Sequence, residues 1–98
     1  MSLYTFIMEF ENGTYLSQVR AESIENTRFE WIENLDVASI EHFEESDKAY
    51  ILENIYDDSP TEIENLINVW CLTLLTENDK LAILNIVQTG EKSKTTNN

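Results

Sequence analysis

The sequence predicts an α+β domain in which a four-stranded antiparallel sheet, with elements in the order ββααββ, carries a helical layer on one face. Strand-like apolar runs lie near both ends of the chain, at residues 3–21 and 69–89, whereas residues 24–58 place apolar side chains at helical spacing. Ninety-eight residues, 42% of them hydrophobic, suffice for one core. We therefore expect a single domain over residues 1–89 and a disordered polar tail over residues 90–98.

The first apolar run predicts a β-hairpin. The dipeptide Asn12-Gly13 tolerates the two positive φ angles of a type I′ turn, which would place Phe10 opposite Tyr15. One face of this hairpin is expected to meet the core, because four apolar side chains occupy alternate positions: Tyr4, Phe6, Met8 and Phe10.

The middle of the chain predicts two helices with a break near residues 44–46. The first, over about residues 24–35, follows the N-cap candidate Ser23 and carries one apolar stripe: Ile24, Trp31, Ile32 and Leu35. The second follows another cap candidate, Ser46, and ends before Pro60.

The last third of the chain predicts a second hairpin. Residues 69–75 and 81–89 are β-rich apolar runs joined by the polar turn at residues 77–80, and they are apolar enough to occupy the centre of the sheet. Cys71 is the only cysteine, so no internal disulfide can form, and its place in an apolar run predicts a buried, inert thiol.

Charge is the strongest functional signal. Of the 19 acidic residues, 14 lie between Glu22 and Glu64, and only Arg28 and Lys48 oppose them, so this stretch carries nearly all of the net charge of −13. Such a field attracts a cationic protein partner. Six basic residues against 19 acids would repel phosphates, so we expect no binding to nucleic acid.

No residue pattern indicates catalysis or metal binding. His42 is the only histidine, so neither a Ser-His-Asp set nor the usual zinc site can be assembled. The acids near Asp57 lack the spacing and the glycine of a calcium-binding loop. Residues 1–10 show no signal peptide and no membrane span. We therefore expect a cytoplasmic protein that is not an enzyme, uses no cofactor or metal, and binds no membrane.

The acids place the expected partner-binding surface on the outward side of the helical layer and its loops. Its candidate residues are Phe29, Glu30, Glu33, Glu41, Glu44, Glu45, Asp57 and Asp58. Phe29 lies away from the apolar stripe; it either packs under residues 36–47 or forms an exposed aromatic anchor ringed by charge. Arg28 falls within the stripe, so its stem should pack while its head reaches an acid at the rim. The exposed face of the sheet is the alternative interface.

Several stretches resemble a group of small bacterial proteins: Tyr4-Thr5-Phe6, Gly13-Thr14-Tyr15, Asn68-Val69-Trp70-Cys71 and Asn85-Ile86-Val87, with Trp31 between them. In size and acidity the chain is also similar to the immunity proteins of contact-dependent growth inhibition and related polymorphic toxin systems. Those proteins neutralise the toxin domain of a sibling cell's effector, often a nuclease. The resemblance implies a toxin inhibitor that occludes the active site of a basic domain.

Immunity proteins share no single fold, so the resemblance assigns no binding residue to this chain. Two other classes stay open on the sequence alone. One is a DNA mimic that inhibits a restriction or defence nuclease, and the other is a small acidic adaptor protein. Fold class cannot choose among the three, because function depends on the site and not on the fold.

Overall fold

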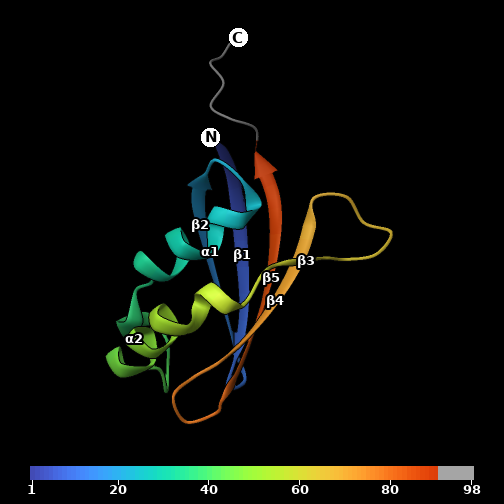
Figure 1. Cartoon of the computed structure of the whole chain (residues 1–98). Helices are drawn as coiled ribbons and strands as arrows, with labels where there is room; N and C mark the ends of the chain where they lie inside the picture. Colours follow the sequence, from blue (N-terminus) through green and yellow to red (C-terminus); the bar gives the residue numbers. More distant parts are fainter. Residues whose placement is uncertain (91–98) are drawn as a thin grey trace.

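The computed structural model describes residues 1–90, which form an α+β fold with one antiparallel sheet and two helices (Figure 1). The strands are β1 (Ser2–Phe10), β2 (Gly13–Ala21), β3 (Thr61–Glu62), β4 (Val69–Leu75) and β5 (Leu81–Gly90). The helices are α1 (Ile24–Glu33) and α2 (Glu45–Asn54), and two short 3-10 helices are η1 (Val37–Ser39) and η2 (Ile55–Asp57). The predicted fold class, the antiparallel sheet and the two helices are confirmed.

The predicted tail begins one residue too early, because Gly90 is the last residue of β5 and pairs with Leu3 of β1. The rest of that tail lies outside the described residues. None of the helices in residues 1–90 has the length and apolarity needed to cross a membrane.

The sheet has five strands, not the predicted four, in the order β2-β1-β5-β4-β3. The additional strand, β3, pairs Thr61 with Cys71 and Glu62 with Trp70, and so covers only the first part of the outer edge of β4. A strand of two residues is too short to show an alternating pattern, which is why the sequence did not reveal it. The central strand is β5, which agrees with its apolar sequence.

The turn of the β1–β2 hairpin lies one residue earlier than predicted. Its turn residues are Glu11 and Asn12, with φ angles of 48° and 69°, and Phe10 pairs with Gly13. The predicted pairing of Phe10 with Tyr15 is therefore wrong by two residues. Because strand side chains alternate with a period of two, the same side chains still face the core. Gly13 is needed for close approach, since a Cβ there would lie 2.6 Å from the Tyr15 hydroxyl oxygen.

The start of α2 also differs from the prediction. Its N-cap is Glu44, and Ser46 lies inside the first turn, so the predicted cap is wrong. The Asp47 carboxylate accepts a hydrogen bond from the Glu44 main-chain N–H at 2.9 Å, as in a capping box. At α1, Ser23 does occupy the N-cap position, although its side chain makes no capping hydrogen bond.

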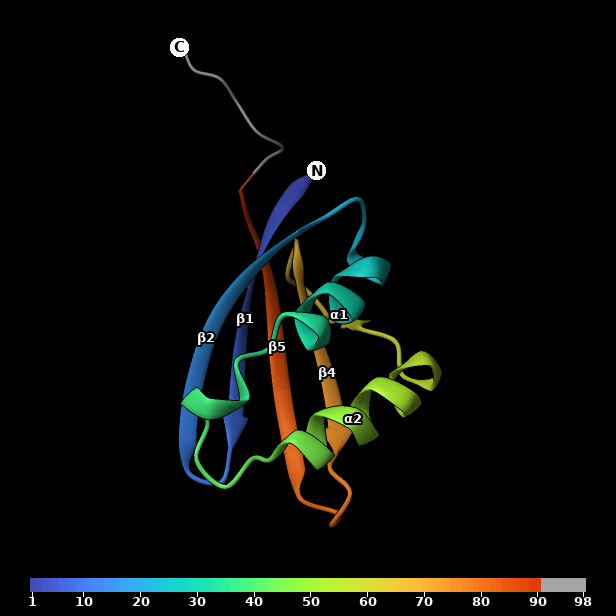
Figure 2. The same ribbon diagram turned by 90° about the vertical axis from the view of Figure 1, so that its left-hand side faces the viewer.

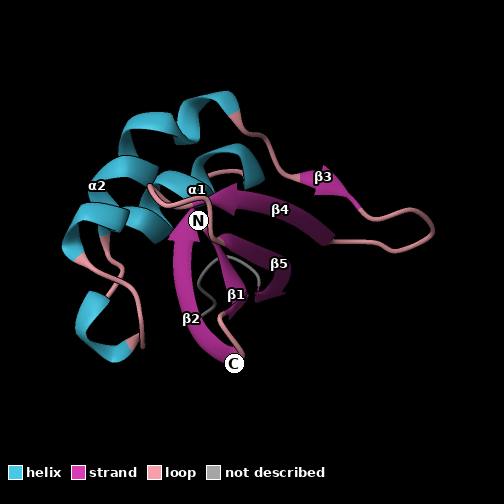
Figure 3. Ribbon diagram, turned by 90° about the horizontal axis from the view of Figure 1, so that it is seen from below, coloured by secondary structure: helices cyan, strands magenta, loops and turns pink. Residues whose placement is uncertain are grey.

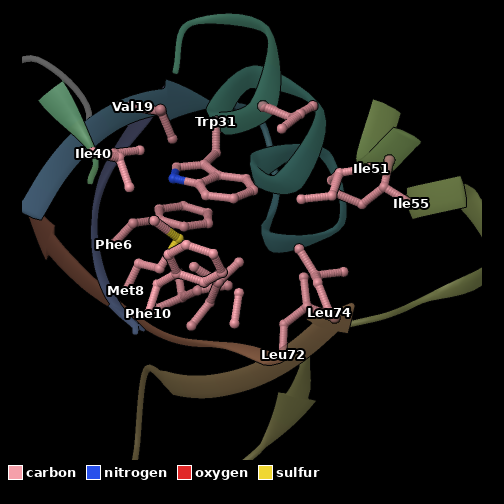
Figure 4. Close-up of a cluster of buried hydrophobic side chains, with 14 of the residues drawn as sticks. Phe6, Met8, Phe10, Val19, Trp31, Ile40, Ile51, Ile55, Leu72 and Leu74 are labelled. Atoms are coloured by element: carbon pink, nitrogen blue, oxygen red, sulfur yellow. The ribbon is translucent and has the colours of Figure 1, made fainter. Parts of the chain in front are cut away.

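The core lies between the helices and one face of the sheet (Figure 4). Phe6 stacks on Trp31 with ring centroids 5.7 Å apart, and Phe10 meets Phe43 edge-on at 5.4 Å. Both helices lie on the same side of the sheet, which curves around the core side chains (Figure 3). These aromatic contacts hold the helical layer on the sheet.

Cys71 is half-buried on the face of the sheet that points away from the helices, so the prediction of a buried thiol is wrong.

Candidate partner-binding surface

The acids predicted to bind a partner lie on the helical layer and are accessible to solvent. All are exposed except Asp58, which is half-buried at the end of η2. We refer to them together as the acidic layer: Glu30, Glu33, Glu41, Glu44, Glu45, Asp57 and Asp58. Exposed carboxylates can form ion pairs with the Lys and Arg side chains of a partner and accept hydrogen bonds from them.

Lys48 forms no ion pair with the acidic layer, because its ammonium group donates to main-chain carbonyls. Lys48 Nζ donates to the carbonyl oxygens of Glu33 at 3.2 Å and Leu35 at 3.1 Å. These carbonyls lie at the C-terminal end of α1, where a cation also interacts favourably with the helix dipole. Lys48 therefore ties α2 to the end of α1 and leaves the neighbouring carboxylates free for other partners.

Arg28 also makes its contacts within the chain, at the place where α1 meets η2. Only 7% of Arg28 is exposed, and its Nε donates to the Ile55 carbonyl oxygen at 3.2 Å. Its Nη1 donates to the Glu25 carbonyl oxygen at 2.8 Å and to the Glu25 carboxylate at 3.2 Å. That contact is the one ion pair within residues 1–90. The expectation that the Arg28 head reaches an acid at the rim is confirmed.

Phe29 contacts a residue that the sequence did not single out. It packs against Tyr56 of η2 with ring centroids 5.0 Å apart, not under residues 36–47 as one reading expected. The Arg28 guanidinium, 4.4 Å from the Phe29 ring centroid, holds η2 beside this part of α1, which brings the two rings together. Tyr56 is 69% exposed, so it presents more aromatic surface to a partner than the half-buried Phe29 does. Its sequence signal was an aromatic residue directly before Asp57.

The candidate residues gather mainly at the two ends of α2. Asp57 and Asp58 adjoin the Phe29–Tyr56 pair beyond the C-terminal end, whereas the segment 41–45 lies at the N-terminal end. Ten residues of helix rise about 1.5 Å each, so the groups are about 15 Å apart. Figure 2 shows α1 and α2 side by side on the side of the molecule facing the viewer. One protein interface of about 800 Å² per partner is wide enough to include both groups.

Other features of the described structure do not add chemistry to this surface. Residues 1–90 contain no group of three or more His, Cys, Asp or Glu side chains placed to hold a metal ion. His42 is exposed in a turn before α2 with a φ of 65°, and is not on a helix. A cavity of about 290 Å³ lies between β2 and residues 34–40, and none of the candidate residues lines it.

Comparisons with protein-family models, with curated proteins and with solved structures found no match for this chain. What the chain binds is therefore inferred from its own surface.

Proposed function

We propose that this protein is an immunity protein of the contact-dependent growth inhibition or polymorphic toxin type. It binds a cognate basic toxin domain, a nuclease, in the cytoplasm and occludes its active site. The observation that supports this most directly is that Arg28 and Lys48 donate to main-chain carbonyls, which leaves the acidic layer exposed and without an ion pair to either cation. A nuclease needs a cationic cleft to bind phosphates, and a carboxylate-rich surface can fill that cleft and exclude the substrate.

The two parts of the surface have different roles in this proposal. The acidic layer attracts the toxin over long range, and such steering raises association rates by about 10- to 1,000-fold. The Phe29–Tyr56 pair supplies apolar contact area at short range, as aromatic side chains at interface hot spots do. The acids thus govern association, and the aromatic pair governs dissociation.

Co-expression tests the proposed function. The open reading frame directly upstream of this gene is expressed alone and together with this protein, because an immunity gene follows its toxin gene. We expect the upstream product alone to stop growth and this protein to restore it. Purified together, the two chains should form a complex without nuclease activity. An upstream product that is harmless without this protein would exclude the immunity role.

Salt is expected to affect the free protein and its complex in opposite directions. Raising salt from 0.01 to 0.15 M shortens the screening length from about 30 Å to about 8 Å. The free protein should become modestly more stable, because its acids are closer together when folded than when unfolded. Association with the basic domain should slow, because the same screening removes their attraction. Thermal unfolding and stopped-flow binding measure both trends; a melting temperature that falls with salt would contradict this role of the acids.

A further inference from the structure

The sheet face opposite the helices is almost free of charge, and it is most apolar over β4 and β5. We refer to the side chains of β1, β2, β4 and β5 that point away from the helices as the outer face. Its only charged residues are Glu9 and Arg20, whose charges cancel. Three leucines stand far into solvent on it: Leu16 is 69% exposed, and Leu75 and Leu81 are each 50% exposed. The molecule therefore has one strongly negative side and one nearly neutral side with exposed apolar residues.

The central strand of the outer face, β5, is apolar on both of its sides along most of its length. Along β5, Ala82, Leu84 and Ile86 face the core, while Ile83 and Val87 lie between them on the outer face. A strand with one solvated face normally alternates apolar and polar residues, whereas a strand covered on both faces reads as a continuous apolar run. The sequence of β5 is of the second kind. We infer from it that the outer face is covered in the functional protein.

Asn85 lies at the centre of the outer face, and it differs from Thr5 and Thr89, which are polar residues of the same face that hydrogen-bond to each other. It is in the middle of β5, the central strand, with Ile7 and Cys71 paired beside it and Ile83 and Val87 before and after it on the same face. The structure shows no hydrogen bond between the Asn85 side chain and another residue of the described chain. A partner that covered this half-buried amide would remove its hydrogen bonds to water, so the partner would have to supply replacements.

We propose that two copies of this chain pair through their outer faces, with a two-fold axis beside Asn85. In a two-fold interface each patch meets the same patch of the other copy, so it must be self-complementary. A primary amide meets this requirement, because each Asn85 can donate an N–H to the amide oxygen of the other. A polar residue that lies between apolar neighbours in an interface also favours one register.

The charge distribution favours a second copy over other occupants. Each copy carries a net charge of −13, so two copies repel one another through any surface that includes the acidic layer. The neutral outer face is where they can meet with the least repulsion. A cationic partner, in contrast, is attracted to the helical side. Pairing through the outer faces leaves both acidic layers exposed, so one dimer presents two sites for the partner.

The size of the outer face predicts a weak dimer. Four strands about 4.8 Å apart, with eight residues of about 3.4 Å each, make a plane of about 500 Å². A pair of copies would then bury at most about 1,000 Å² in total, below the usual range of about 1,200–2,000 Å² for stable complexes. The sheet also curves away from the outer face (Figure 3), so contact begins at its centre, where Asn85 lies. We expect pairing at micromolar to millimolar protein concentration.

Sedimentation equilibrium of the full chain tests this proposal without any toxin. We expect the average molecular mass in solution to rise from 11.4 kDa toward twice that value as the protein concentration increases. Added salt should strengthen the dimer, because it screens the repulsion between two acidic chains. This is opposite to its expected effect on toxin binding. A chain that stays monomeric to millimolar concentration in 0.15 M salt would overturn the proposal.

Matched variants then test the position of the axis. Asn85→Asp keeps the shape of the side chain but places two carboxylates together, and should raise the dissociation constant of the dimer at least about tenfold. Asn78→Asp makes the same change at an exposed turn and should leave the dimer intact. Thr73→Glu, at an exposed position of the outer face, is a second test and should also weaken the dimer. A dimer that tolerates both outer-face changes forms elsewhere, which would overturn the proposal.

Discussion

The double variant Glu30→Lys/Glu33→Lys is expected to bind the basic toxin domain at least about ten times more slowly than the unchanged protein. Both carboxylates are exposed on α1 and belong to the acidic layer. The change adds positive charge where the partner is expected to carry positive charge, so it removes attraction and introduces repulsion. Lysine in the last turns of α1 is also favourable for the helix dipole, so the fold should be retained. Stopped-flow association at low salt measures the effect.

A control with the same change in net charge separates position from total charge. Glu11→Lys/Glu77→Lys alters two exposed acids in the β1–β2 and β4–β5 turns, outside the acidic layer. It should slow association much less than the α1 variant. Equal slowing by the two variants would mean that only the net charge matters. No slowing by the α1 variant would remove α1 from the interface and favour the outer face of the sheet.

Reversing Glu41, Glu44 and Glu45 together should slow association to a similar or greater extent. That triple variant can also destabilise α2, because Glu44 is the N-cap of α2 and Glu45 lies in its first turn. Lysine at a helix N-terminus opposes the dipole and costs about 0.3–1 kcal/mol per charge. Its binding should therefore be measured at a temperature where circular dichroism shows that α2 is intact.

Replacing Arg28 with methionine is expected to reduce the free energy of unfolding by about 2–4 kcal/mol. The guanidinium supplies hydrogen bonds to the carbonyl oxygens of Ile55 and Glu25, and these groups would lose their donors in a largely buried place. Methionine has a similar length and no charge, so little of the loss comes from an empty volume. In a domain of this size each kcal/mol lowers the melting temperature by about 4–8 °C.

The matched control for this variant is Arg20→Met, which removes an exposed arginine from the surface of β2. Its stability should change by no more than about 0.5 kcal/mol. Arg28→Lys should fall between the two, because one ammonium group cannot reproduce the fork of donors that arginine presents. Urea unfolding followed by circular dichroism gives all three values. If Arg28→Met is as stable as Arg20→Met, Arg28 does not hold η2 against α1.

The fold class followed from local patterns because each pattern depends only on neighbouring residues. Alternation along residues 3–10 placed Tyr4, Phe6, Met8 and Phe10 on the core face, and helical spacing placed Trp31 and Ile32 there. The accumulation of acids between Glu22 and Glu64 is likewise a property of composition. Exposed acids are the ordinary case, since charged side chains are rarely buried without a partner. The acidic layer was therefore predictable as a surface.

The tertiary structure decided the features that depend on residues distant in sequence. The two-residue strand β3 exists only because β4, eight residues further along the chain, offers it an edge. Tyr56 becomes part of the candidate surface through its contact with Phe29 on another helix. No local pattern contains these contacts.

The most important of these tertiary contacts are the hydrogen bonds that Arg28 and Lys48 donate to main-chain carbonyls. From the sequence, either cation could have neutralised nearby acids through pairs on its own helix. In the folded chain, Arg28 does pair with Glu25 of its own helix, but it also donates to the Ile55 carbonyl, and Lys48 donates to the Leu35 carbonyl instead of pairing with an acid. A carbonyl that is withdrawn from water needs a donor more than an exposed carboxylate needs a counter-ion. The sequence alone determined how much negative charge the protein carries, and packing decided that this charge stays available at the surface.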